Sequence, residues 1–167
     1  KIMANIIGID LGTTNSVLAY LDSLGKPKIL SGEDGGNLTP SVVAFEKKKV
    51  LVGTEAKKKM RIDSKNVFSE FKREMGSDTK YDIANKEYTP KDLSGLVLKK
   101  MIDNFEQNVG KADQIVITTP ANFTNEARED TLESGEIAGF SVKHIINEPT
   151  AAAIYFAHEL RLTDGNY

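Results

Sequence analysis

The sequence has no cysteine and only 2 histidines among its 167 residues. Without cysteine there is no disulfide framework, no thiolate metal site and no cysteine nucleophile. His144 and His158 are too few and too far apart to indicate a histidine metal site. Neither belongs to a Ser/His/Asp arrangement of the kind that supports a hydrolytic triad.

The chain also lacks an excess of either charge, since 22 Lys and Arg residues face 24 Asp and Glu residues. This balance argues against nucleic acid or an anionic membrane as partner, because both select basic surfaces. The longest uncharged run, Gln114–Asn125, is far shorter than the roughly 18 apolar residues of a membrane span. Lys1–Ile9 lacks the pattern of a signal peptide, so we expect a cytoplasmic protein.

What the sequence does contain is ordinary for a soluble globular domain, with 40% hydrophobic and 28% charged residues. Its length is that of a single domain of about 100–200 residues. Such a chain can bury a sizeable core without covalent staples.

The first third predicts short strands separated by turn residues. The expected strands, in chain order, are Asn5–Asp10, Asn15–Leu21, Pro27–Leu30, Ser41–Phe45 and Val50–Val52. A polar, glycine-rich segment, Ser31–Pro40, joins the third strand to the fourth. The lysine run 47–49 favours a solvated hairpin tip over a phosphate-binding patch.

Helices dominate the rest of the chain. They are expected at Thr54–Arg61, Asn66–Met75, Thr89–Val109, Thr124–Ala138 and Asn147–Leu160, with a hairpin at Tyr81–Tyr88 and strands at Gln114–Thr118 and Val142–Ile146. The continuous apolar character of Gln114–Thr118 is typical of a strand buried on both faces. The order of elements predicts an α/β layer fold with an inserted subdomain at roughly Thr39–Gly110.

The sharpest local feature is the segment Gly8–Ser16, which reads GIDLGTTNS. Gly12 lets a phosphate approach the backbone, while the amides and hydroxyls of Thr13 and Thr14 can donate to it. Asp10 is placed to hold Mg²⁺ directly or through water. Neither the P-loop nor the Rossmann pattern is present. An ordinary β-hairpin turn, with Thr and Ser as strand formers, is the alternative.

A second feature is Glu148, which stands between an apolar strand and the start of a helix. In open α/β sheets, ligands bind at that end of the strands. The alternative is that Glu148 only favours the positive end of the helix. The alanines at positions 151–153 predict a smooth helix face that packs tightly on the sheet.

A third feature is Lys72, in the segment FKREMG. On the expected helix it points away from an apolar stripe formed by Phe68, Phe71 and Met75. A lysine there can reach a γ-phosphate or orient an attacking water, because phosphoryl transfer depends on positioning and charge stabilisation. A plain surface lysine is the alternative.

Three segments together resemble the start of the nucleotide-binding domain of seventy-kilodalton heat-shock (DnaK-type) chaperones. They are IIGIDLGTTNS at 6–16, FKREMG at 71–76 and INEPTAAA at 146–153. The resemblance runs from Asn5 to Leu160, and residues 71–88 are closer to a specialised bacterial branch. It implies an actin-like ATPase fold with a ribonuclease H-like core. The chain would be its first lobe, with a base subdomain at 1–38 and 111–167 and a smaller inserted α/β subdomain at 39–110.

The resemblance also implies roles for single residues. Asp10 and Glu148 would hold Mg²⁺ mostly through water, with K⁺ as a further candidate. Lys72 would orient the attacking water and stabilise charge on the γ-phosphate, so the implied catalytic residues are Lys72, Glu148 and Asp10. The contacts to the phosphates of ATP or ADP would come from Gly12, Thr13 and Thr14.

Pro120 and Arg128 match family positions that relay the nucleotide state toward the interdomain linker. Three nearby positions depart from the family pattern: Asn122 stands for its tyrosine, Leu132 for a lysine and His144 for an arginine. They lie on the side where the linker and the J-domain co-chaperone dock in the family. We therefore expect intact ATP chemistry with altered coupling to the linker or the co-chaperone.

The implied activity is hydrolysis of ATP coupled to binding and release of client peptides, with a J-domain co-chaperone and a nucleotide exchange factor as partners. The family's second phosphate loop and second lobe are not in these residues, so we expect weak ATP binding and negligible turnover from them alone. An exposed cleft-facing surface predicts self-association. The alternatives are a sugar or acetate kinase, a filament-forming actin-like protein, and a catalytically silent nucleotide-gated regulator. A kinase would not explain INEPTAAA or FKREMG, a filament former would be expected to form filaments with ATP, and the presence of Lys72, Asp10 and Glu148 argues against a silent regulator.

Overall fold

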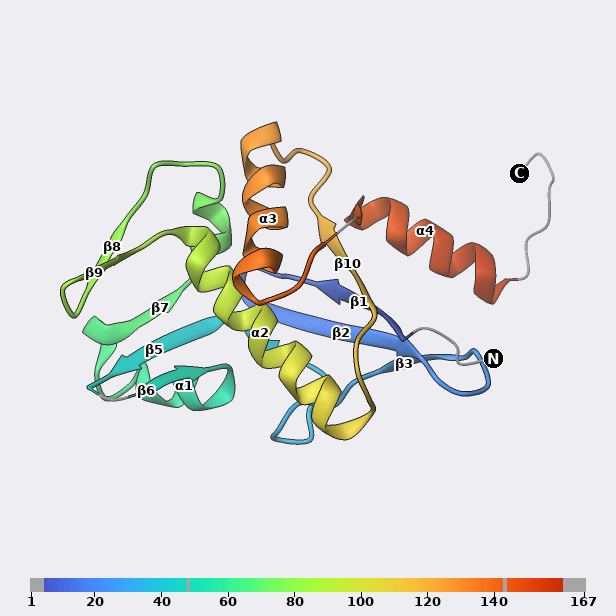
Figure 1. Cartoon of the computed structure of the whole chain (residues 1–167), viewed down its shortest axis with the longest axis horizontal. Coiled ribbons are helices and arrows are strands. Elements are labelled where there is room, and N and C mark those ends of the chain that lie inside the picture. Colours follow the sequence, from blue (N-terminus) through green and yellow to red (C-terminus); the bar gives the residue numbers. More distant parts are fainter. Residues whose placement is uncertain (1–4, 48, 143, 161–167) are drawn as a thin grey trace.

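The computed structural model describes residues 5–47, 49–142 and 144–160. Its main sheet has six strands in the order β11-β10-β1-β2-β3, with β4 paired to β2 (Figure 1). The strands are β1 (Ile6–Asp10), β2 (Asn15–Leu21), β3 (Pro27–Ile29), β4 (Thr39–Pro40), β10 (Gln114–Thr119) and β11 (His144–Asn147). Strands β1, β10 and β11 run parallel, whereas β2 is antiparallel to β1, β3 and β4. The sheet therefore begins with an antiparallel meander, β1 to β3, and continues with the parallel strands β10 and β11.

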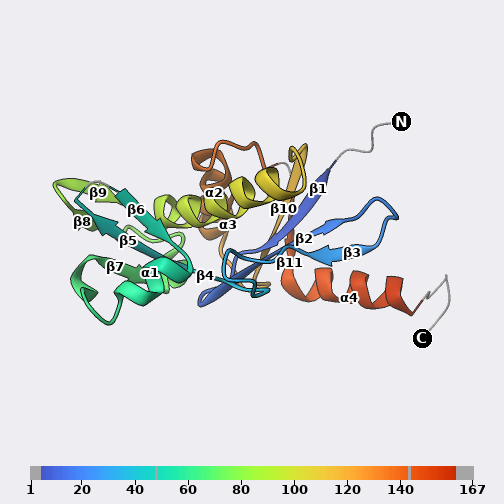
Figure 2. The ribbon, with the colours of Figure 1, turned by 90° about the horizontal axis from the view of Figure 1, so that it is seen from below.

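A smaller antiparallel sheet, in the order β6-β5-β7, lies at the opposite end of the molecule from the last helix (Figure 2). It consists of β5 (Val42–Glu46), β6 (Lys49–Val52) and β7 (Val67–Ser69), and α1 (Thr54–Lys59) packs against it. Two short 3₁₀ helices, η1 (Ser64–Asn66) and η2 (Phe71–Glu74), flank β7. The expected hairpin is confirmed as β8 (Tyr81–Ile83) and β9 (Lys86–Tyr88).

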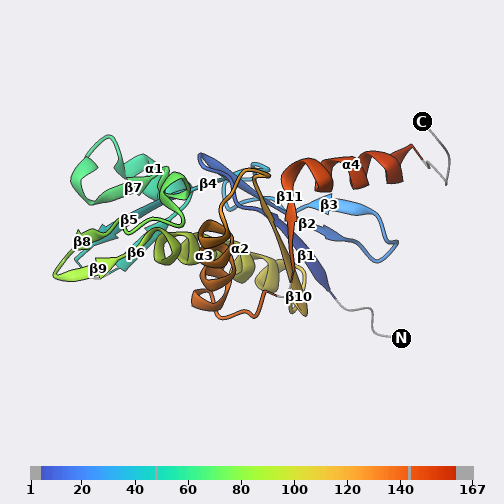
Figure 3. The same cartoon turned by 90° about the horizontal axis from the view of Figure 1, so that it is seen from above.

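Three long helices complete the fold. Helices α2 (Pro90–Asn108) and α3 (Asn125–Ile137) cover one face of the main sheet, and α4 (Glu148–Glu159) lies on the other (Figures 2 and 3). Among the described residues, no helix is both long and apolar enough to cross a membrane. The sheet is thus a central layer with unequal cover on its two sides.

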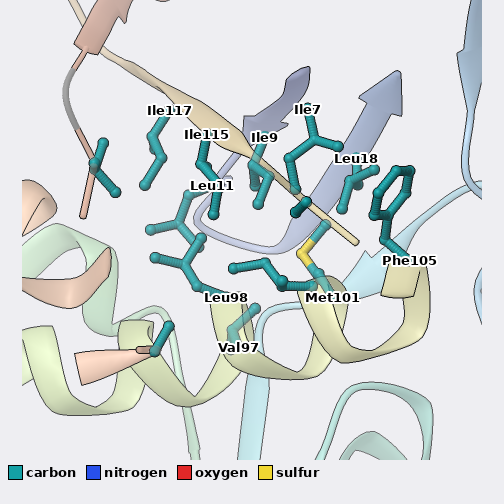
Figure 4. Packing of buried hydrophobic residues seen from close by; sticks show 14 of the residues in the cluster. Ile7, Ile9, Leu11, Leu18, Val97, Leu98, Met101, Phe105, Ile115 and Ile117 are labelled. Carbon is teal, nitrogen blue, oxygen red and sulfur yellow. The ribbon is translucent and has the colours of Figure 1, made fainter. Parts of the chain in front are cut away.

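The main core lies between the sheet and α2 (Figure 4). Burying each large aliphatic side chain stabilises the fold by roughly 1.5–3 kcal/mol. The inward-facing residues of the sheet include Ile7, Ile9, Leu18, Ile115 and Ile117, and those of α2 include Val97, Leu98, Met101 and Phe105. The same cluster also contains Val43 and Phe71 from the region of the smaller sheet. Both regions therefore contribute to this core, while the smaller sheet and α1 enclose a second cluster of Val42, Ala44, Leu51 and Ala56.

Local sequence signals set the start of α2 and α3. Thr89 and Asp92 form a reciprocal capping box, in which the Thr89 N–H donates to Asp92 Oδ2 at 2.7 Å, and Pro90 follows in the first turn. Thr124 caps α3 by accepting from the Ala127 N–H at 3.2 Å. Each cap contributes about 1 kcal/mol. Both expected helix starts are confirmed.

The expected helix over Asn66–Met75 is wrong. Val67 and Phe68 instead pair with β5, where Val43 lies opposite Phe68. Glu70 has a left-handed φ of 59°, which ends any helix there. Sheet pairing of β-branched and aromatic residues outweighs the helical spacing of the apolar side chains.

Two expectations about burial are also wrong. Strand β10 is not buried on both faces, because its buried residues alternate with half-buried or exposed ones. None of the described residues of α4 is buried, so its alanines do not pack tightly on the sheet. Ala151 is half-buried, while Ala152 and Ala153 are exposed. The second face of the sheet is only lightly covered.

Candidate functional site

The parallel strands bring distant residues to one edge of the main sheet. In register, Asp10 at the end of β1 lies beside Thr118 of β10, and Thr119 lies beside Asn147 of β11. Glu148 follows directly as the first residue of α4. Neighbouring strands are about 4.8 Å apart, which places the ends of β1 and β11 about 10 Å from one another. Ligands of open α/β sheets bind at such an edge.

The turn between β1 and β2 depends on Gly12. A Cβ at this position would lie 2.0 Å from the carbonyl oxygen of Asn15, which no side chain can tolerate. Thr13 is half-buried and Thr14 is exposed. In the part of the chain that the structure describes, no hydrogen bond engages the N–H or hydroxyl groups of Thr13 and Thr14. These donors are therefore available to an anion.

Two buried serines form hydrogen bonds to the backbone of this turn. Ser16 Oγ accepts from the Gly12 N–H at 3.2 Å and lies 2.9 Å from Ser41 Oγ, while Ser41 Oγ donates to the Gly12 carbonyl at 2.7 Å. Ser16 belongs to the sequence motif, but Ser41 lies 25 residues further along the chain. No pattern in the sequence indicates that the two residues are in contact. The serines were not expected to contribute to the site.

The Asp10 side chain is exposed at this edge. Its Oδ1 accepts a hydrogen bond from Thr118 Oγ1 at 2.8 Å. The two residues are direct neighbours across parallel strands, so the strand register itself produces the contact. Thr118 is a second contributor that sequence reasoning did not find.

Lys72 and Glu148 form an ion pair, with Lys72 Nζ 2.8 Å from Glu148 Oε1. The lysine side chain is only 8% exposed, whereas the glutamate is 38% exposed. Lys72 Nζ also lies 5.6 Å from the ring centroid of Phe123, a cation–π distance. The alternative interpretation of Lys72 as a plain surface lysine is therefore wrong. A buried ammonium group needs a paired anion, and Glu148 supplies it.

The segment that follows Lys72 is anchored to α2 and α3. Gly76, with φ of 81°, donates its N–H to Asp130 Oδ2 at 2.7 Å, and a Cβ there would lie 2.7 Å from the backbone nitrogen of Ala127. Lys91 joins the same group through Glu133 at 2.6 Å and Asp130 at 3.5 Å. The Glu133 carboxylate raises the pKa of Lys91. This network holds the loop that places Lys72.

Arg128 of α3 ties together the ends of β10 and β11. Its guanidinium donates to Thr119 Oγ1 at 3.1 Å, to Asn147 Oδ1 at 2.9 Å and to the Ala121 carbonyl at 3.4 Å. Pro120, half-buried, follows β10 directly. Arg128 therefore contacts the residue that directly precedes Glu148, the partner of Lys72.

Of the three positions that depart from the family pattern, Asn122 lies between Ala121 and Phe123, which contact Arg128 and Lys72 respectively. Asn122 and His144 are exposed. Leu132 is half-buried and packs against the main core from α3.

On its other side, the edge opens into a groove of about 530 Å³ between the sheet and α4. Asp10 and Thr118 line one end. The rest of the lining is mostly apolar and includes Val17, Val116, Ile146 and Ile154. This groove does not share the polar character of the edge.

The side chains at the edge fit phosphate and Mg²⁺. Mg²⁺ keeps several waters and takes one or two carboxylates, which Asp10 and Glu148 can supply. Across the described residues, no group of three or more His, Cys, Asp or Glu side chains is arranged to enclose a metal ion. The glycine turn at Gly12 leaves room for a phosphate against the backbone.

The fold and its polar edge define a mixed α/β domain with a site at the ends of its parallel strands. A sequence model of the Hsp70 protein family matches residues 6–84 and 78–159. The chain therefore belongs to the Hsp70 family. This family consists of chaperones with an ATPase domain of actin-like fold, which bind ATP or ADP with Mg²⁺ and work with clients and co-chaperones. The match does not favour a sugar kinase or a filament-forming protein.

Proposed function

We propose that these residues form the first lobe of a DnaK-type Hsp70 ATPase domain, in a specialised bacterial branch. The base subdomain would comprise residues 1–38 and 111–167, and the smaller inserted subdomain residues 39–110. One observation carries the proposal: the turn after β1, Asp10 and the Lys72–Glu148 pair gather at a single edge of the sheet. Lys72 and Glu148 are 76 residues apart in the chain.

In this proposal the amides of Thr13 and Thr14, beside Gly12, bind the phosphates of ATP or ADP. Asp10 and Glu148 hold Mg²⁺ through its water shell, and K⁺ is a further cation of the same site. Mg²⁺ supplies positive charge that neutralises the phosphate oxygens. Asp10 is suited to this task because only one of its oxygens is engaged by Thr118 in the described structure.

Lys72 has two anionic partners in turn. In the structure its ammonium group is paired with Glu148. With ATP, the γ-phosphate competes for the same ammonium group, which then orients the attacking water and stabilises developing charge. Glu148 would then be free to help hold Mg²⁺ through its water shell, so the pair would report whether a γ-phosphate is present.

Arg128 and Pro120 then relay that change. Arg128 contacts Asn147, the residue before Glu148, and also the end of β10. A shift of Glu148 would therefore be transmitted through Asn147 and Arg128 to α3. This is the side toward which the interdomain linker and a J-domain co-chaperone would dock.

We further propose that coupling to that partner is altered by Asn122, Leu132 and His144. His144→Arg is the cleanest test, because His144 is exposed whereas Leu132 packs against the core. In the ATPase domain that contains this chain, His144→Arg should change the stimulation of hydrolysis by a J-domain protein. Unchanged stimulation would contradict altered coupling. Leu132→Lys tests the same point but also disturbs the core.

The cellular role that follows is ATP-dependent binding and release of unfolded client peptides in the cytoplasm, assisted by a J-domain co-chaperone and a nucleotide exchange factor. The neutral overall charge fits neither nucleic acid nor a membrane as partner.

The 167 residues on their own should bind ATP only weakly and turn it over negligibly. They offer one phosphate-binding turn and no opposing wall that excludes water. The apolar side chains of α4 are exposed, with Ile154 at 58%, Tyr155 at 54% and Phe156 at 63%, so the chain should also self-associate. Isothermal titration calorimetry should give a millimolar dissociation constant for Mg·ATP. Micromolar affinity would contradict the claim that these residues supply only part of the nucleotide-binding site.

Asp10→Asn provides the matched test of the site in the same titration. Binding of Mg·ADP should weaken markedly, whereas binding of ADP in the presence of EDTA should change little. Asp113→Asn, at an exposed carboxylate outside the site, is the control. Equal effects of the two substitutions would contradict the proposed metal site.

A further inference from the structure

The buried serines under the phosphate-binding turn form a closed ring of hydrogen bonds. Ser41 has a single hydroxyl proton, and the carbonyl of Gly12 can only accept, so Ser41 Oγ donates to it at 2.7 Å. Ser41 must then accept from Ser16, whose Oγ lies 2.9 Å away. Ser16 in turn accepts from the Gly12 N–H at 3.2 Å. The ring therefore begins and ends on Gly12.

Both hydroxyls are removed from water. Ser16 is 0% exposed and Ser41 is 1% exposed. Across the described residues, every buried side-chain oxygen or nitrogen has a hydrogen-bond partner. Losing one member of the ring would leave buried polar atoms unpaired, which is costly.

The ring also joins two parts of the fold. Ser16 lies on β2 of the main sheet, while Ser41 lies between β4 and β5, where the chain enters the smaller sheet. The Ser41 N–H donates to the Thr14 carbonyl at 2.9 Å, next to the same turn. The start of the smaller sheet is thus bonded to both ends of the turn.

We propose that Ser16 and Ser41 are positioning residues for nucleotide binding. They fix the two backbone groups of Gly12 by hydrogen bonds, so that the Gly12 N–H is turned inward and the donors of Thr13 and Thr14 are left for phosphate. The inference rests on the proposed nucleotide site, but its structural part does not depend on a ligand. Neither serine touches the phosphate; both act through Gly12.

Ser41→Ala is the direct test, with nucleotide binding measured in the ATPase domain that contains these residues. The dissociation constant for Mg·ADP, followed by NMR titration, should rise about tenfold. In the absence of nucleotide, the Gly12 amide should exchange with solvent at least about tenfold faster. The double variant Ser16→Ala/Ser41→Ala should cost binding about as much as Ser41→Ala alone, because the ring acts as a unit.

Ser94→Ala is the matched control. Ser94 is also 0% exposed, but it lies on α2, where its hydroxyl contacts Met75 Sδ at 3.6 Å. It should leave both the Mg·ADP affinity and the exchange of Gly12 unchanged, even if the chain is less stable.

The outcomes separate the two proposals. If the wild-type domain binds Mg·ADP and Ser41→Ala binds equally well, the positioning role is wrong and the nucleotide site stands. If the wild-type ATPase domain that contains these residues does not bind Mg·ADP, the proposed function fails, and Gly12 exchange alone decides whether the ring holds the turn. Unchanged exchange in Ser41→Ala, with the native spectrum retained, would overturn the inference in either case.

Discussion

The two halves of the site are built in opposite ways. The turn at Gly12–Thr14 is held by backbone geometry and uncharged hydroxyl groups, and among the described residues the donors of Thr13 and Thr14 make no hydrogen bond. The Lys72–Glu148 pair joins segments 76 residues apart, and its charges already satisfy one another. In the proposed mechanism the turn is preformed, whereas the ion pair exchanges partners.

This difference has a functional meaning. A preformed turn binds any phosphate chain without reorganisation, so it does not distinguish ATP from ADP. An ion pair that must open responds only to an anion able to compete for the ammonium group. We infer that the turn provides affinity and that Lys72 and Glu148 provide discrimination.

The largest effect should come from breaking the turn itself. Gly12→Val places a side chain where even a Cβ lies 2.0 Å from the Asn15 carbonyl oxygen. Urea denaturation should show a loss of about 3 kcal/mol in the free energy of unfolding. Gly8→Ala is the control, because no atom lies within 4 Å of its added Cβ. Similar losses for both would contradict the steric account.

The next largest effect should come from removing the anion of the ion pair. Glu148→Leu leaves the Lys72 ammonium group buried without a carboxylate, which should cost about 2 kcal/mol of unfolding free energy after allowance for the exposure of Glu148. Glu159→Leu, at the exposed end of the same helix, should change stability by less than about 0.5 kcal/mol. If Glu148→Leu is equally neutral, the pair does not stabilise the fold.

Removing the cation of the pair should have little effect on stability but a large effect on the discrimination between ATP and ADP. Lys72→Met leaves Glu148 partly exposed to water, so stability should change by about 1 kcal/mol or less. The variant should bind ATP and ADP with the same affinity, because nothing then responds to the γ-phosphate. Lys26→Met, at an exposed lysine, should retain the wild-type difference between the nucleotides. A retained difference in Lys72→Met would contradict the discriminating role.

The smallest effect should come from Thr118→Val, which removes one hydrogen bond to Asp10 and keeps the side-chain shape. Stability should fall by about 1 kcal/mol or less. The Mg²⁺ concentration needed for half-maximal ADP binding should rise severalfold, and Thr118→Ser should restore it. If Thr118→Ser behaves like Thr118→Val, the hydroxyl does not orient Asp10.

The same contrast explains what the sequence could predict. The strand–turn–strand around Gly12 is local, so residue types and spacing were enough to predict β2 at Asn15–Leu21 and the turn before it. The capping box of α2 was predicted for the same reason. Signals of this kind depend only on neighbours in the chain.

Contacts between distant segments escaped prediction. The helix expected at Asn66–Met75 failed because pairing of Val67 and Phe68 with β5 is a tertiary effect. The burial of Lys72 beside Glu148 and Phe123 likewise depends on packing between distant segments and has no local signal. The serine ring and the Thr118–Asp10 contact depend on strand register, which periodicity does not reveal.

The central claim is that one edge of the sheet binds nucleotide. The most direct measurement is an NMR chemical-shift map of the 167-residue chain titrated with Mg·ADP and with Mg·ATP. Both nucleotides should shift the amides of Gly12, Thr13 and Thr14, and Mg·ATP alone should also shift those around Lys72 and Glu148. Shifts concentrated in the apolar groove beside Ile154, or the same map in Gly12→Val, would contradict the account.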